Sequence, residues 1–110
     1  MSSGTYNGRI ELGRELSFTQ AQQLRSYFIQ FKSGLEISSD GRALQWNRKD
    51  PEQNIEVTLT HIIESYLSKW GIISCGVITA VWPEKVNYDI IVVGNRVKLF
   101  RDGNITTVKI

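Results

Sequence analysis

The sequence has few of the side chains that most often carry catalytic or metal chemistry. Its 110 residues include one cysteine and one histidine. Because Cys75 has no second cysteine to pair with, a disulfide within the chain and a Cys-rich zinc site are excluded. His61 likewise has no second imidazole with which to share a metal ion. A single cysteine is typical of proteins from a reducing compartment, so we expect a cytoplasmic location.

Long apolar runs and phosphate-binding glycine motifs are also missing. No apolar stretch approaches the ~20 residues that span a bilayer, and residues 1–8 lack the apolar segment of a signal peptide. Neither G-x-G-x-x-G nor G-x-x-x-x-G-K-[ST] occurs. The sequence therefore predicts no membrane segment, no cofactor and no metal ion.

The charge is small and unevenly distributed. The formal net charge is +2, and residues 85–110 hold five basic and two acidic side chains. This is well short of the concentrated basic face of a duplex-binding protein. With 41% hydrophobic residues, the chain has enough apolar material for one core, and we expect residues 1–110 to form a single domain.

Three glycine-centred turns are the most informative feature that is present. Asp40-Gly41, Gly94-Asn95 and Asp102-Gly103 are each flanked by alternating apolar residues. Two-residue hairpin turns need positive φ angles, which Gly, Asn and Asp tolerate best. The sequence therefore predicts three β-hairpins. In the first, the turn Asp40-Gly41 places Leu35 opposite Trp46 on the core face.

Two segments have the apolar spacing of amphipathic helices. The first is 18–33, where Ser17 and Gln20 have the spacing of a capping box. The second is 55–70, preceded by Asp50-Pro51 as a helix start. Alternating β-branched residues leave it open whether 54–60 begins this helix or is extended.

Strands are predicted at 6–12, in the 35–46 hairpin, and at 72–82, 88–93, 97–101 and 105–110. The expected fold is α+β, with three or four strands after the second helix; with three, the order is β-α-β-β-α-β-β-β. An antiparallel sheet of five to six strands would have two helices on one face. Within this order, the unit strand-helix-hairpin-helix-strand is expected to be one strand short of a ferredoxin-like repeat.

No set of side chains predicts an enzyme. We expect His61 to face solvent and Cys75 to be a small buried hydrophobe inside its strand. Asp40 and Asp102 are explained by their turns, and Glu84 and Asp89 flank the turn at Pro83. The prediction is a non-enzymatic protein.

Binding is predicted on the sheet face that the helices leave uncovered, or on a free edge strand. Exposed aromatic and arginine side chains are the usual anchors of protein interfaces. The expected partner-binding residues are Trp82, Tyr88, Arg96, Lys98 and Arg101. The alternative is a single-stranded nucleic acid, with bases stacked on Trp46, Trp82, Tyr88 and Phe100 beside the basic side chains of the last strands.

The segments SGLEISSDGRALQW, SYLSKWG, GVITA and YDIIVVGNRVKLF resemble a group of small uncharacterised proteins of bacteriophages and prophages. These proteins have a similar order of a strand, a helix, a hairpin ending in Leu-x-Trp, a helix closed by Trp-Gly and a final meander. The resemblance implies a compact accessory protein. That class includes inhibitors that bind host enzymes, anti-CRISPR proteins among them.

Overall fold

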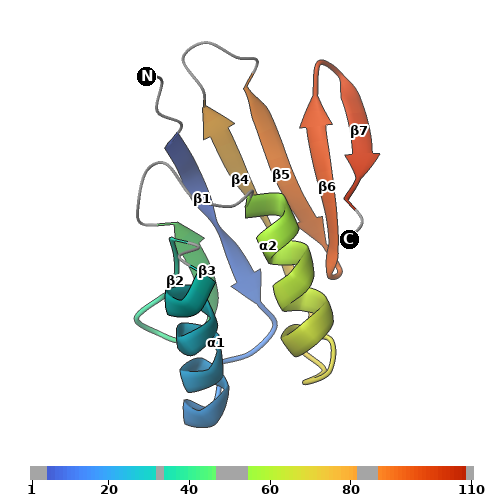
Figure 1. Cartoon of the computed structure of the whole chain (residues 1–110). Helices are drawn as coiled ribbons and strands as arrows, with labels where there is room; N and C mark the ends of the chain where they lie inside the picture. The colour runs from blue at the N-terminus through green and yellow to red at the C-terminus, as the bar shows by residue number, and fades with distance from the viewer. Residues whose placement is uncertain (1–4, 32–33, 47–54, 82–86, 109–110) are drawn as a thin grey trace.

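A computed structural model describes residues 5–31, 34–46, 55–81 and 87–108 (Figure 1). It contains seven strands, two α-helices and a π turn that continues the second helix. In chain order they are β1 (Thr5–Leu12), α1 (Phe18–Phe31), β2 (Leu35–Ile37), β3 (Ala43–Trp46), α2 (Ile55–Ile62), η1 (Ile63–Leu67), β4 (Ser74–Val81), β5 (Tyr88–Val93), β6 (Arg96–Arg101) and β7 (Asn104–Thr107). The helix start predicted at Asp50-Pro51 lies outside the described residues.

All seven strands join one antiparallel sheet in the order β2-β3-β1-β4-β5-β6-β7. The prediction of five to six strands was too low, because the β2–β3 hairpin pairs with β1 and β7 pairs with β6. The segment β1-α1-β2-β3-α2-β4 is a complete βαββαβ unit, so no strand of the ferredoxin-like order is missing. The meander β5-β6-β7 then widens the sheet.

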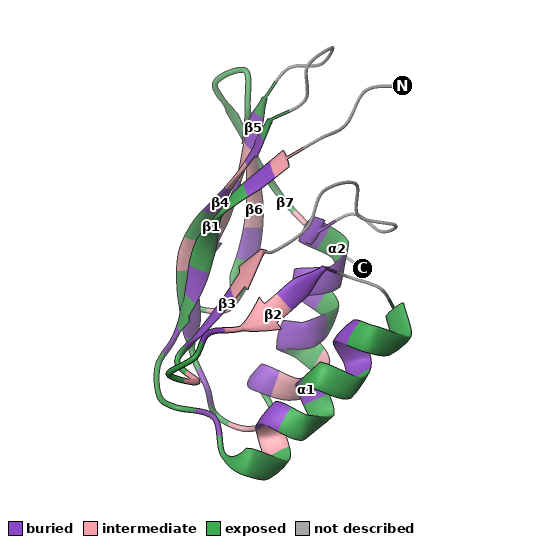
Figure 2. Cartoon of the chain, turned by 90° about the vertical axis from the view of Figure 1, so that its left-hand side faces the viewer, coloured by how far each residue is buried: buried purple, intermediate pink, exposed green. Residues whose placement is uncertain are grey.

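Both helices cover the same face of the sheet, as Figure 2 shows from the side. Helix α1 contributes Leu24 and Phe28 to the core, and α2 contributes Leu59 and Ile62. These side chains meet every second residue of the strands, as expected when one face of an antiparallel sheet is buried. The predicted α+β class with two helices on an antiparallel sheet is confirmed.

The helix ends follow local sequence signals. The predicted capping box is present, because Ser17 N–H donates to Gln20 Oε1 at 3.0 Å and Gln20 N–H donates to Ser17 Oγ at 3.2 Å. Residues 55–62 are helical, which settles the open alternative for this segment. The helix then widens into the π turn, where Ser68 N–H donates to Ile63 C=O at 2.8 Å.

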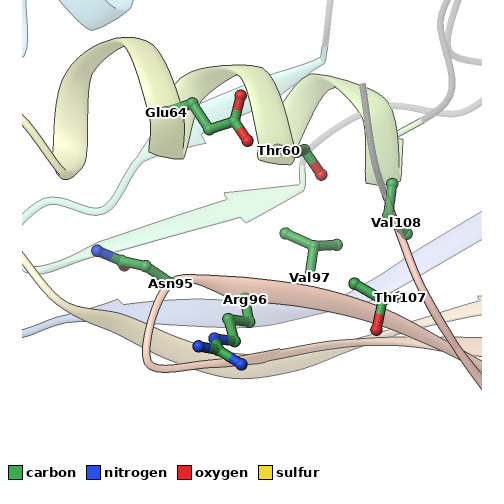
Figure 3. A pocket seen from close by; sticks show the side chains of 7 residues that line it. All are labelled: Thr60, Glu64, Asn95, Arg96, Val97, Thr107 and Val108. Carbon is green, nitrogen blue, oxygen red and sulfur yellow. The ribbon is translucent and has the colours of Figure 1, made fainter.

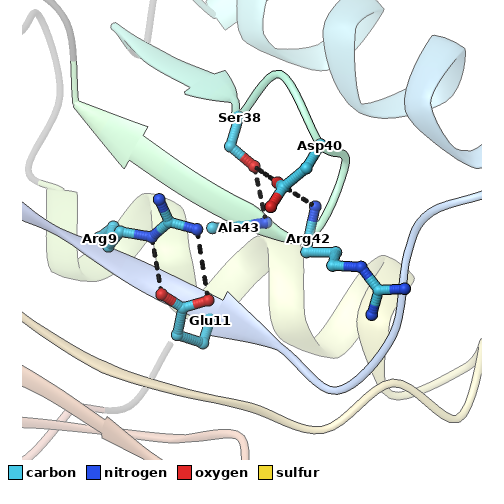
Figure 4. A network of polar contacts seen from close by, with 6 residues as sticks. All are labelled: Arg9, Glu11, Ser38, Asp40, Arg42 and Ala43. Atoms are coloured by element: carbon cyan, nitrogen blue, oxygen red, sulfur yellow. Dashed lines mark hydrogen bonds and ion pairs between the residues drawn. The ribbon is translucent and has the colours of Figure 1, made fainter.

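The first hairpin has the predicted strand register, with Leu35 opposite Trp46. Its loop is wider than predicted: Ser38 N–H donates to Ala43 C=O at 2.9 Å, so four residues form the turn. The Asp40 carboxylate accepts from Ser38 Oγ and from Arg42 N–H (Figure 4). These two hydrogen bonds, the one from Ser38 first, lower the pKa of Asp40.

Two glycines, one on each strand, allow β1 and β4 to approach each other closely. Gly8 has φ +131° and lies opposite Ile78, and Gly76 has φ +156° and lies opposite Ile10. A Cβ at Gly8 would lie 2.2 Å from the Val77 carbonyl oxygen, and one at Gly76 would lie 2.4 Å from the Arg9 carbonyl oxygen. Any side chain at either position would therefore push the two strands apart.

We predict that Gly8→Ala destabilises the protein by on the order of 3–5 kcal/mol, because the new methyl group meets backbone and the φ angle is unfavourable. The matched control is Gly71→Ala, where φ is +71° but no atom lies within 4 Å. It should cost about 1 kcal/mol. Urea unfolding of both variants measures the difference, and equal costs would contradict the proposed close contact.

Candidate functional site

The sheet face opposite the helices carries exposed apolar side chains at its centre. Val77 on β4 is 46% exposed and pairs with Ile91 on β5, and Val93 is 59% exposed. Further along, Phe100 on β6 pairs with Ile105 on β7, which is 62% exposed. We call this surface the open face and define its apolar patch by Val77, Ile91, Val93, Phe100 and Ile105.

Charged side chains stand beside the apolar patch on β6 and on the neighbouring strand β1. On β6, Arg96 lies opposite Val93 and Lys98 lies opposite Ile91, so two cations stand directly beside the patch. On β1, Arg9 and Glu11 form an exposed ion pair with Nε and Oε1 2.7 Å apart (Figure 4). The open face therefore combines the apolar patch with the cations Arg96 and Lys98 on β6, with Asp89 opposite Phe100, and with the Arg9–Glu11 ion pair on β1.

The predicted partner-binding residues do not share one face. Arg96 and Lys98 lie on the open face, and Trp82 lies outside the described residues. The placement of Tyr88 on that face was wrong: it is 8% exposed and aligned with Ile90 and Val92 of the core. Arg101 is on the helix-covered face too, with its guanidinium carbon 4.6 Å from the centroid of the Tyr88 ring. The cause is strand alternation, which sends residues 88 and 101 to the opposite face from 96 and 98.

Tyr88 belongs to a buried polar cluster with Tyr6 and Glu56. Burial raises the pKa of Tyr6, and a hydrogen bond with Tyr88 raises it further. The Tyr6 ring also packs against Trp46, with ring centroids 4.8 Å apart. One carboxylate oxygen of Glu56, Oε2, is buried, and the described residues provide no hydrogen-bond partner for it. The cluster lies on the helix-covered face of the sheet, so its aromatic rings do not form an exposed stacking surface.

Cys75 and His61 are both exposed. The expectation of a buried Cys75 was wrong, because alternation along β4 places it opposite Glu11 on the open face. The prediction that His61 faces solvent is confirmed. Its ring stacks on Tyr27 with centroids 5.4 Å apart, and Ser65 Oγ lies 3.4 Å from Nε2. No carboxylate that hydrogen-bonds to this imidazole is seen in the described part of the chain.

Among the hollows formed by the described residues, two border α2 and η1. One of about 440 Å³ separates α2 and η1 from the C-terminal strands (Figure 3). It is lined by Thr60, Glu64, Asn95, Arg96, Val97, Thr107 and Val108. Val97 points from β6 toward the helix, whereas the Arg96 side chain projects from the opposite face of β6, away from the helix. The second hollow, about 630 Å³ between the helices, is bordered by Tyr27, His61 and Tyr66.

Neither hollow combines a nucleophile with a base and a charge that would orient it. Within residues 5–31, 34–46, 55–81 and 87–108, no three His, Cys, Asp or Glu side chains are grouped to hold a metal ion. In the same part of the chain, neither helix has the length and apolar character needed to cross a membrane.

Comparisons of the chain with protein-family models, curated proteins and solved structures find no match. The resemblance to phage and prophage proteins therefore stays a prediction. The open face, found from strand pairing and exposure, is the feature that best supports a function.

The two faces predict different responses to truncation. Tyr88→Ala should cost on the order of 3–5 kcal/mol, since a large buried ring is removed. Arg96→Ala should change the free energy of unfolding by less than about 0.5 kcal/mol, because its side chain is exposed. Urea titration of both variants tests the assignment of faces. A small cost for Tyr88→Ala would show that this ring is not a core residue.

Proposed function

We propose that the protein is a non-enzymatic module that binds a protein partner through the open face. The observation that carries the proposal is the apolar patch, which extends from β4 to β7 on a sheet face that no described helix covers. Contiguous apolar surface bordered by charges is typical of protein interaction sites. Arg96 and Lys98 would contribute polar contacts at its border.

The alternative partner, a single-stranded nucleic acid, has weaker support. Stacking needs exposed aromatic rings beside the cations. Tyr88 is buried, and Trp46 is on the core face against Tyr6. Among the described residues, Phe100 is the aromatic side chain that stands on the open face with Arg96 and Lys98. One ring and two cations favour a protein surface over a base-stacking platform.

The resemblance to phage and prophage proteins supports a more specific form of the proposal. A small domain whose described residues assemble no catalytic group would act by occupying a surface of a host protein and thereby inhibiting or modulating it. In this form the protein resembles anti-CRISPR and other inhibitors of host defence, and it would work in the host cytoplasm.

The test is capture of a partner from native-host lysate with the immobilised protein. Val77→Glu combined with Val93→Glu should reduce capture at least tenfold, because two carboxylates would be buried in an apolar interface. Ile29→Glu is the matched control: Ile29 is 78% exposed on α1, on the helix side. It should leave capture unchanged, and both proteins should keep their melting temperature within a few degrees.

Nuclease treatment of the lysate separates the two partner classes. A protein partner stays bound after treatment, whereas a complex mediated by nucleic acid is lost. Labelled single-stranded oligonucleotides provide the direct measurement, and we expect no salt-sensitive submicromolar binding by fluorescence anisotropy. Equal capture by the Val77→Glu, Val93→Glu protein and the wild type would overturn the proposed surface.

A further inference from the structure

The outer edge of β7 is a second surface that remains available for pairing. β7 is the last strand of the sheet, and in Figure 1 no described helix lies beside its outer edge. All four of its residues, Asn104–Thr107, are exposed. The strand contains no charged residue and no proline, and both are features that commonly block edge pairing.

The ladder between β6 and β7 shows which backbone N–H and C=O groups of β7 point away from β6. Val108 N–H donates to Val97 C=O at 2.9 Å, which makes these two residues a hydrogen-bonded pair. Hydrogen-bonded and non-bonded pairs alternate in an antiparallel ladder. Thr106 therefore bonds to β6, whereas the N–H and C=O groups of Ile105 and Thr107 point away from the sheet.

The opposite edge of the sheet is protected. Strand β2 is three residues long, and α1 packs beside it. Glu36 stands at the middle of β2, where its carboxylate accepts from Gln45 Nε2 at 3.0 Å. A short edge with an acidic side chain resists pairing with another strand. As far as the described residues show, β7 is the one open edge of the sheet, so self-pairing would stop at two copies.

We propose that β7 pairs antiparallel with β7 of a second copy of this chain, with Thr106 on the two-fold axis. This register places Ile105 of each copy opposite Thr107 of the other. Every outward N–H and C=O of Ile105 and Thr107 then has a hydrogen-bond partner. Side chains stay on matching faces, because residues 105 and 107 both lie on the open face and residue 106 lies on the helix side.

Charge does not oppose this pairing. Among the described residues, the nearest cations of the open face are Arg96 and Lys98, which lie on β6, one strand behind the junction. The two β6 strands of a dimer would be three strand spacings apart, about 14 Å, which exceeds the Debye length of ~8 Å at physiological salt. A junction of two short strands is smaller than a standard interface, so association should depend on concentration.

Charge-swap variants at the axis test both the pairing and its register. Thr106→Lys and Thr106→Glu would each place like charges directly opposite one another, and each should weaken self-association roughly tenfold. An equimolar mixture of the two should associate at least as strongly as the wild type. Sedimentation velocity over a concentration series measures all three. Thr19→Lys, on the exposed surface of α1, is the matched control and should behave as wild type.

Circular dichroism checks that the variants fold. If the Thr106 variants do not, Ile105→Pro replaces them, since it removes an outward N–H that no strand of the same copy uses. Wild-type protein that stays monomeric over the whole concentration range would overturn the proposal. So would dimers that survive Thr106→Lys, or a mixture that fails to associate. This inference does not rest on the partner proposed for the open face, and loss of capture by Val77→Glu, Val93→Glu leaves it intact.

Discussion

The pairing of β1 with β4 is the interaction on which the rest of the structure depends. It extends from Thr5 opposite Val81 to Leu12 opposite Ser74. On one side of this pair, β3 and β2 complete the βαββαβ unit, and on the other side β5, β6 and β7 extend the sheet. Gly8 and Gly76 make room for the close approach of the strands, while Ile10 and Ile78 pack beneath the helices.

The one-sided placement of the helices gives the protein its principal surfaces. Two short helices bury one face of a seven-stranded sheet, and the opposite face keeps Val77, Ile91 and Val93 in contact with solvent. On soluble proteins, an exposed apolar patch of this kind commonly marks a site where another molecule binds. The open face and the β7 edge meet at Ile105, whose side chain lies on the open face and whose outward backbone groups lie on the edge.

Local features could be predicted from the sequence because they depend on neighbouring residues. The Ser17 and Gln20 capping box and the pairing of Leu35 with Trp46 are examples. The face of each strand in the meander was harder to predict, because β4 and β5 carry apolar residues on both faces. For Tyr88, a usable signal was Asp89: a carboxylate marks the solvent side, and its neighbour must then point inward.

The sequence by itself determined the α+β class, the hairpin turns and the absence of a disulfide, since composition, period and turn chemistry act over a few residues. Only the tertiary structure decided that Arg96 and Lys98 share a face with Val77 and Val93 while Tyr88 and Arg101 do not. It also decided that β7 is an open edge and β2 a protected one. These outcomes depend on which strands pair and which face the helices cover, and long-range packing, not local preference, determines both.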